Sequence, residues 1–144
     1  MKVNIKKLNE NAVIPTYGSE YSAGADLYAC IEQEVTILPG ETKLIKTGLA
    51  IEVPVGYGAF IYARSGLASK RGLAPANKVG VVDADYYSNE GNDGNIGFRL
   101  LNLGSTPYEI KVGDRIGQGV FIKYGTIKDD NTTSTRTGGF GSTN

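Results

Sequence analysis

Asp83 is the residue in this sequence whose setting most favours catalysis. It lies within Gly80-Val81-Val82-Asp83-Ala84-Asp85-Tyr86, where a β-branched run leads into an acidic, turn-prone segment. This pattern predicts a strand that ends in a hairpin turn, which would hold the carboxylate on the sheet and leave it open to solvent. A carboxylate so placed can act as a general base. The alternative is that Asp83 and Asp85 are ordinary turn aspartates.

The lack of histidine narrows the chemistry further. The 144 residues include no His and a single Cys, Cys30. That composition removes the commonest general base, the His-dependent nucleophilic triads and most zinc sites. The base of an enzyme would therefore be a carboxylate, a Lys or a Tyr, and a metal would be a hard cation bound by oxygen, Mg²⁺ first. One Cys forms no internal disulfide, which fits a reducing compartment.

Two segments carry groups suited to a polyphosphate. The tail Arg136-Thr137-Gly138-Gly139-Phe140-Gly141-Ser142-Thr143-Asn144 combines glycine N–H groups, hydroxyls, one Arg and one aromatic ring. Such groups can wrap phosphates and stack on a base, although a disordered terminus has a similar composition. Arg64-Ser65-Gly66 falls where a strand ends and a short helical turn begins. It predicts either an anion site or a helix capped by Ser65 with a solvated Arg.

Two other polar positions need a partner or a purpose. Asp26 lies between apolar neighbours, where a carboxylate is costly unless it is paired or close to a metal. The segment Gly113-Asp114-Arg115-Ile116-Gly117-Gln118 either contributes to a site or forms a turn with a surface Asp114–Arg115 pair, Gln118 then being an ordinary strand residue.

The elements that must position these residues are mostly strands. Twenty glycines and short apolar runs indicate many short strands joined by tight turns. Strands are predicted at 3–5, 35–38, 43–53, 59–63, 79–82, 96–103, 108–112 and 115–123. An irregular segment is expected at 9–22, a short apolar segment interrupted by Asp26 at 25–29, and one helical turn at 64–71. The expected fold class is all-β, a jelly roll or barrel with one short helix.

The chain is expected to form one domain with a tail. Residues 1–128 would form the β domain, and 129–144 a flexible tail whose one large apolar residue is Phe140. Covering the exposed sheet edges predicts a homo-oligomer. Fifteen basic and fifteen acidic residues cancel, which argues against nucleic acid and membrane surfaces as partners. With no bilayer-length apolar run and no apparent leader, we expect a cytoplasmic protein.

Five ordered segments resemble the signature motifs of the homotrimeric dUTP pyrophosphatase (dUTPase) family, and the resemblance runs over nearly the whole chain. They are Ala23-Gly24-Ala25-Asp26-Leu27-Tyr28, Arg64-Ser65-Gly66-Leu67-Ala68, Gly80-Val81-Val82-Asp83-Ala84-Asp85-Tyr86, Gly113-Asp114-Arg115-Ile116-Gly117-Gln118 and Gly138-Gly139-Phe140-Gly141-Ser142-Thr143. The resemblance implies a jelly-roll (β-clip) subunit, a homotrimer with a C-terminal arm, and active sites that draw on more than one chain. The implied reaction is hydrolysis of dUTP to dUMP and pyrophosphate, with Mg²⁺ on the triphosphate.

The resemblance also implies a role for each site residue. Asp83 matches the catalytic Asp that orients and deprotonates the water attacking the α-phosphorus. Tyr86 matches the aromatic residue that packs on the deoxyribose and leaves no room for a 2′-hydroxyl. The positions that match uracil contacts are Asn77, Val81, Val82 and about Gly97.

The remaining matches concern the triphosphate and the tail. Asp26 matches the motif-one Asp near the water shell of the metal. Phe140 matches the tail aromatic that stacks on uracil. The positions that match phosphate contacts are Arg64, Ser65, Gly66, Gln118, Arg136, Gly141 and Ser142.

Three features depart from the family pattern. The arm at 87–95 is longer by several residues than in family members, which affects the alignment at Gly97. Arg136 lies one residue closer to Phe140 than in many members. Gly117 replaces a commoner Ala, a change that looks tolerable.

Two alternative functions differ in chemistry. A dCTP deaminase, or a bifunctional deaminase–dUTPase, shares the fold but needs a Glu at the pyrimidine C4. The Glu nearest motif three is Glu90, which we expect to be exposed. A nucleotide-switched regulator would use the 87–95 loop to bind a protein partner.

Overall fold

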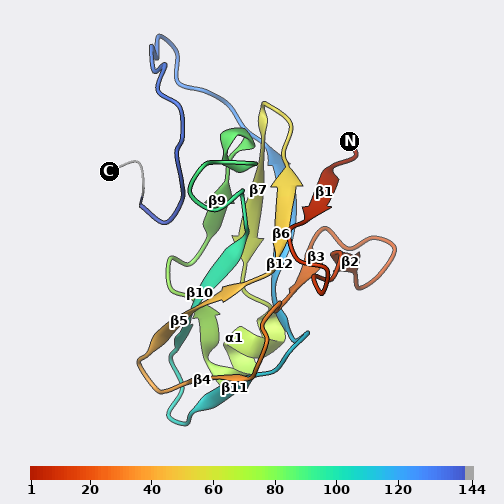
Figure 1. The fold of residues 1–144 in the computed structure, drawn as a ribbon, viewed down its shortest axis with the longest axis vertical. Coiled ribbons are helices and arrows are strands. Elements are labelled where there is room, and N and C mark those ends of the chain that lie inside the picture. The colour runs from red at the N-terminus through yellow and green to blue at the C-terminus, as the bar shows by residue number, and fades with distance from the viewer. Residues whose placement is uncertain (142–144) are drawn as a thin grey trace.

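The computed structural model describes residues 1–141 and is built from antiparallel strands (Figure 1). The strands are β1 (Asn4–Lys7), β2 (Thr16–Tyr17), β3 (Ala25–Tyr28), β4 (Val35–Ile37), β5 (Thr42–Lys46), β6 (Leu49–Glu52), β7 (Tyr57–Tyr62), β8 (Leu73–Pro75), β9 (Gly80–Val82), β10 (Gly97–Asn102), β11 (Tyr108–Ile110) and β12 (Arg115–Lys123). One α-helix, α1 (Ser65–Arg71), and one 3₁₀ turn, η1 (Ala84–Tyr86), complete the described part. The expected all-β jelly roll with one short helix is confirmed.

The largest sheet carries most of the chemically interesting positions. Its strand order is β2-β3-β12-β7-β9, so β9 is an edge strand that pairs only with β7. A second sheet has the order β5-β10-β8, and β1-β6 and β4-β11 form two further two-stranded sheets. Between the sheets lies one core of buried apolar residues, which include Leu27, Ile37, Ile45, Leu49, Ile61, Leu73, Phe98, Leu100, Ile110 and Ile116.

The predicted strand at 43–53 is wrong in one respect, because the structure divides it into β5 and β6. Gly48 has a φ of 69°, which ends the extended run, and β5 then pairs with β10 while β6 pairs with β1. Thr47 is fully buried at this switch, and both its amide and its hydroxyl donate to the carbonyl of Ile96. Alternating apolar residues do not show which strand a segment pairs with. The alternation continues past Gly48, so the sequence pattern predicted one strand where the structure has two.

Three smaller differences are local. The segment expected to be irregular at 9–22 contains the two-residue strand β2, and β8 went unpredicted because Pro75 is a poor strand residue. The cap of α1 is Arg64, which makes no side-chain capping bond, so Ser65 is the first helical residue and not the cap. The helix ends at Gly72 in the left-handed conformation, with a φ of 68°.

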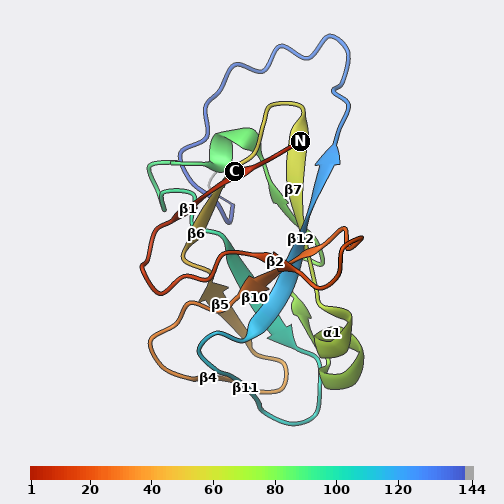
Figure 2. The ribbon, with the colours of Figure 1, turned by 90° about the vertical axis from the view of Figure 1, so that its right-hand side faces the viewer.

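The tail leaves the body after β12 and returns to it. In Figures 1 and 2 it arches away beyond the end of β12 and comes back beside β9 and η1. It contains no strand or helix from Tyr124 to Gly141. None of the helices in residues 1–141 has the length and hydrophobicity that crossing a bilayer needs.

Candidate nucleotide-binding site

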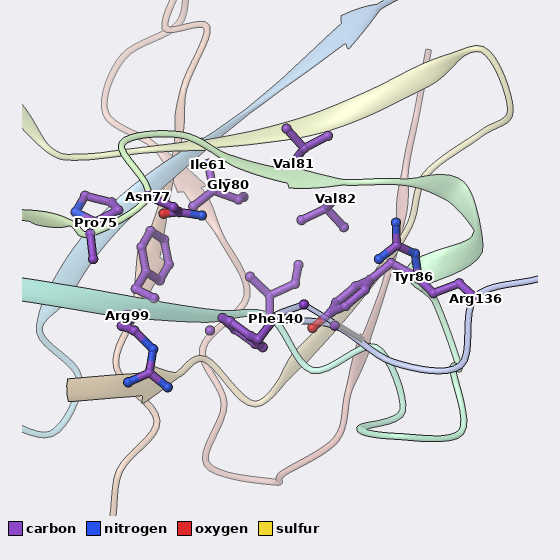
Figure 3. Close-up of a pocket in the computed structure, with 16 residues that line it drawn as sticks. Ile61, Pro75, Asn77, Gly80, Val81, Val82, Tyr86, Arg99, Arg136 and Phe140 are labelled. Carbon is purple, nitrogen blue, oxygen red and sulfur yellow. The ribbon is translucent and has the colours of Figure 1, made fainter. Parts of the chain in front are cut away.

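A pocket of about 420 Å³ lies between β9 and β10, and the end of the tail forms part of its wall. Figure 3 shows Pro75 and Asn77 at one end, Tyr86 and Arg136 at the other, and Phe140 between them. The volume falls in the range of small-molecule sites. Eight of the thirteen predicted substrate-binding residues line it: Asn77, Val81, Val82, Tyr86, Gly97, Arg136, Phe140 and Gly141.

The edge position of β9 explains why this pocket suits a planar, hydrogen-bonding ligand. One side of β9 pairs with β7, with Val82 opposite Ala59 and Val81 opposite Phe60. In the sheet order no strand follows β9 on its other side. An edge strand presents backbone N–H and C=O groups that a ligand edge can pair with.

Gly97 and Phe140 line the pocket across from β9. A Cβ added to Gly97 would lie 3.0 Å from Leu44 and 3.6 Å from the Phe140 ring, so a side chain here would crowd the space beside the ring. Phe140 has a φ of 53° and keeps 57% of its surface exposed although its ring lies at the pocket. An exposed aromatic ring at a pocket is suited to stacking on a ligand.

Asp83 directly follows Val82 and bonds to Arg136, two residues that line this pocket. It follows β9 directly and forms the N-cap of η1, so the strand end and the 3₁₀ turn together fix its backbone. Its side chain is 43% exposed and accepts a hydrogen bond from Nη2 of Arg136 at 2.5 Å, while Nε of Arg136 donates to Asp85 at 3.0 Å. The carboxylate is thus solvent-accessible and faces a guanidinium from the tail.

Tyr86 is the best-held side chain of the pocket. It is 8% exposed, its hydroxyl donates to the carbonyl of Asn95 at 3.0 Å, and the side-chain amide of Asn92 donates to that hydroxyl at 2.8 Å. Burial raises the pKa of Tyr86 above its ordinary value of 10.0, against smaller lowering effects of the Asn92 hydrogen bond and the Arg136 charge. The phenol therefore stays neutral through the physiological range.

The other predicted residues form a second cluster around Asp26. Nε of Arg64 donates to one carboxylate oxygen of Asp26 at 2.9 Å, and Nη1 of Arg115 donates to the other at 3.3 Å. Gln118 is opposite Asp26 in the β3–β12 pairing and donates to the carbonyl of Ala63 at 3.0 Å. Pairing with two guanidinium groups offsets the cost of placing the Asp26 carboxylate among apolar neighbours.

Several details of this cluster differ from the sequence analysis. Arg115 pairs with Asp26, and Asp114 instead accepts from the amide of Lys111, so no Asp114–Arg115 surface pair forms. No signal in the sequence linked Arg115 to Asp26, because the two residues meet only through the β3–β12 pairing.

The remaining predicted residues that the structure describes do not line the pocket. Ser65 and Gly66 form the exposed first turn of α1. Ser142 lies outside the described residues. Glu90 is exposed, as expected. Pocket residues that the sequence analysis did not single out are Ile61, Pro75, Ala76, Ile96, Phe98 and Arg99.

A strand-edge pocket with an acidic side chain next to one of its lining residues, on an all-β fold, defines the class of site. The comparisons with known proteins then define the family. A family model described as dUTPase matches residues 10–144. The deoxyuridine 5′-triphosphate nucleotidohydrolase of Desulfitobacterium hafniense is 44% identical over 149 aligned positions, which cover 99% of this chain and 95% of that protein. The Rickettsia felis protein of the same name is 45% identical over 148 positions, covering 99% and 96%.

Solved structures agree. The crystal structure of dUTPase from Streptococcus mutans superposes with a TM-score of 0.78 at 30% identity, covering 89% of this chain and 99% of that one. The dUTPase from phage phi11 of S. aureus has a TM-score of 0.78 at 24% identity and shows the shared fold alone. The chain belongs to the dUTPase family.

Proposed function

We propose that this protein hydrolyses dUTP to dUMP and pyrophosphate, and that Asp83 activates the water that attacks the α-phosphorus. Family membership supports the reaction. The observation that carries the mechanism is the position of Asp83, a partly exposed carboxylate that follows the pocket residue Val82 and lies three residues before Tyr86. Phosphoryl transfer depends on positioning and charge neutralisation, so a carboxylate base is sufficient in a chain without histidine.

The uracil would pair with the free edge of β9. Backbone groups at Val81 and Val82, with the Asn77 side chain, would read the edge of the base, and Phe140 would stack on its face. Gly97 lines the pocket without a side chain, and the pocket wall would exclude a methyl group at position 5 of the base. A methyl group excluded by pocket shape changes binding by about 1–3 kcal/mol, and by more where it clashes.

We further propose a homotrimer whose active sites are shared between chains. Asp26 is opposite Gln118, which is opposite Tyr62 of β7, whereas Val82, the neighbour of Asp83, is opposite Ala59. Asp83 lies one residue beyond Val82, so at about 3.3 Å per residue and about 4.8 Å per strand, four residues along and three strands across separate Asp26 from Asp83 by about 20 Å. One triphosphate does not bridge that gap, so Asp83 of one chain needs the Asp26–Arg64 cluster of another.

Mg²⁺ fits this arrangement as an ion held by the substrate. Within residues 1–141 no three His, Cys, Asp or Glu side chains gather into a metal cage, and both oxygens of Asp26 already accept from arginines. Mg²⁺ commonly keeps several waters and takes its other ligands from substrate phosphates. Asp26 would therefore meet the ion through water, and the ion would supply charge neutralisation on the triphosphate.

The tail would complete the site. In the structure Arg136 forms salt bridges with the carboxylates of Asp83 and Asp85, and Phe140 lines the pocket. Substrate phosphates would compete with these carboxylates for the Arg136 guanidinium, which would release Asp83 for its water. Residues 129–144 would act as the mobile arm and 1–128 as the folded domain.

The two alternative functions lack comparable support. Glu90 is exposed, which does not suit proton transfer to a pyrimidine. In the 87–95 loop, the side chains of Asn89 and Asn92 form hydrogen bonds within the loop and to Tyr86. These contacts support a structural role for the loop within the protein and give no support for binding of a protein partner.

The test of the reaction is direct. Purified protein with Mg²⁺ should release pyrophosphate and dUMP from dUTP, and should release no ammonia from dCTP. Ammonia from dCTP would favour the deaminase, and no product from dUTP would reject the proposal.

The shared site has its own test. Asp83→Asn and Arg64→Ala should each abolish turnover, and co-expression of the two variants should restore about a quarter of wild-type activity, because random mixing gives that share of sites both intact residues. A site contained in one chain would regain nothing on mixing. Sedimentation of the wild-type protein as a monomer would also contradict the trimer.

A further inference from the structure

The loop from Tyr87 to Asn95 is built around Tyr86. Its side-chain amides are not turned to solvent, since Asn89 is only 4% exposed. The side-chain amide of Asn89 donates to the backbone carbonyl of Tyr86 at 2.7 Å and to Oδ1 of Asn92 at 2.7 Å. Its Oδ1 accepts from the amides of Gly91 and Asn92 at 3.0 and 3.1 Å. Asn89 therefore holds the loop in a closed turn against the Tyr86 backbone.

Asn92 extends the same network to the far end of the Tyr86 ring. Oδ1 of Asn92 accepts from the amide of Gly94 at 3.0 Å as well as from Asn89, so its Nδ2 must face the other way. Nδ2 donates to the Tyr86 hydroxyl at 2.8 Å, and that hydroxyl donates in turn to the carbonyl of Asn95. Both ends of Tyr86 are thus fixed by one loop.

We propose that Asn92 is a positioning residue for Tyr86, and that it thereby sets the preference for a deoxyribonucleotide over a ribonucleotide. This inference rests on the proposed function, in which the Tyr86 ring packs on the sugar and leaves no room for a 2′-hydroxyl. A ring can exclude one oxygen atom only if it does not tilt away. The hydroxyl is the atom of the ring furthest from the backbone, so a hydrogen bond there limits tilting most, and Asn92 is the side chain that donates it.

The ring is also the surface on which the tail rests. A Cβ added to Gly139 would lie 2.6 Å from Cε2 of Tyr86, so the tail backbone passes directly over the ring. The amide of Gly91 donates to the carbonyl of Thr137 at 2.9 Å. A ring that tilts would therefore meet the closed tail, which gives the loop a second means of keeping Tyr86 in place.

The experiment measures kcat/KM for dUTP and for UTP with the full-length protein. Asn92→Ala should lower the ratio of the two values about tenfold, the effect of about one lost hydrogen bond. The ratio is the informative readout because a loss of folded protein affects both substrates equally. Glu90→Ala, in an exposed residue of the same loop, is the matched control and should leave the ratio unchanged.

Tyr86→Phe removes the Asn92 contact from the other side, together with the hydrogen bond to the carbonyl of Asn95, and leaves the asparagines in place. It should lower the ratio to a similar extent, and adding Asn92→Ala to it should change the ratio less than about twofold, because the contact is already gone. If Asn92→Ala does not fold, Tyr86→Phe alone decides the matter. A wild-type ratio in Tyr86→Phe would overturn the inference while dUTP turnover left the proposed function standing; no dUTP turnover in the wild type would reject the function itself.

Discussion

Gly117 on β12 is a position where the structure predicts a large loss of stability from a small substitution. A Cβ built there would lie 2.0 Å from Cε1 and 2.4 Å from Cζ of Phe98, and 2.9 Å from the carbonyl oxygen of Tyr62. Phe98 is 2% exposed and packs in the core, and the open space beside its ring is the pocket that it lines. Reaching an ordinary contact of 3.4 Å requires a shift of about 1.4 Å. Gly117→Ala is therefore an overpacking mutation in this chain, although Ala is the commoner residue in the family pattern.

The size of the effect follows from two opposing terms. Overpacking a well-filled core costs typically about 1–3 kcal/mol, and an overlap this large belongs at the upper end. Replacing a strand Gly by Ala returns about 0.5–1 kcal/mol of backbone entropy. Gly117→Ala should thus lose about 2 kcal/mol of unfolding free energy. Because Phe98 also lines the pocket, displacement of its ring should raise KM for dUTP.

The chain offers a matched control on the same strand. A Cβ on Gly119 would meet only Ile61 at 3.5 Å and Leu27 at 3.6 Å, which are ordinary contacts. Gly119→Ala should therefore be neutral or stabilising by up to about 1 kcal/mol. Urea unfolding at one fixed protomer concentration compares the two variants, because the stability of an oligomer depends on concentration.

Phe98→Leu provides the second arm of the test. On its own it leaves a cavity and destabilises the protein. Combined with Gly117→Ala it should recover about 1–2 kcal/mol relative to the sum of the single effects, since each change makes room for the other. If Gly117→Ala proved no less stable than Gly119→Ala, or if the double variant were simply additive, the Gly117–Phe98 packing argument would be refuted.

Three other outcomes are expected. Asp83→Asn should keep dUTP binding and lower kcat by about 10²-fold or more, the contribution of a general base; near-normal turnover in a single-turnover assay would assign the base elsewhere. Truncation after Lys128 removes Arg136 and Phe140, and should leave the sedimentation coefficient close to that of the intact oligomer while activity is lost; full activity would show the tail to be idle. Burial raises the pKa of Tyr86 above 10.0, so its contribution to stability is complete below pH 10 and is lost as pH rises through the raised value. Tyr86→Phe should flatten the alkaline decline in unfolding free energy, and an unchanged decline would instead point to Tyr108, whose pKa burial also raises.

Residues close together in the chain were assigned from the sequence with good agreement. The segment around Asp83 does form a strand end followed by a turn, and the helix at 65–71 and the long final strand occur where expected. The predicted hairpin is wrong, because β9 pairs with β7 and not with the next strand, β10. These features depend on turn-prone residues, glycine stops and β-branched runs, which act within a few positions of one another. The absence of histidine alone favours a carboxylate as the general base.

Features that depend on strand pairing could not be predicted in this way. The switch at Gly48, the pairing of Arg115 with Asp26 and the separation between Asp26 and Asp83 all follow from which strands become neighbours and in what register. An alternating pattern specifies the face of a strand and leaves its partner open. The residues of the five motifs were therefore identifiable one by one, but their division into two clusters was not.

The 87–95 loop shows the same limit most clearly. Its run of Asn, Gly, Asp and Ser reads as a solvated loop, because those residue types are common in turns. The structure buries Asn89 and aims Asn92 at a phenol, and both facts arise from the way the loop folds back over Tyr86. The sequence alone determined which side chains could do chemistry, since that is a property of residue type and of near neighbours. The tertiary structure decided which of them touch, since contacts between distant residues depend on strand register and on packing around a common core.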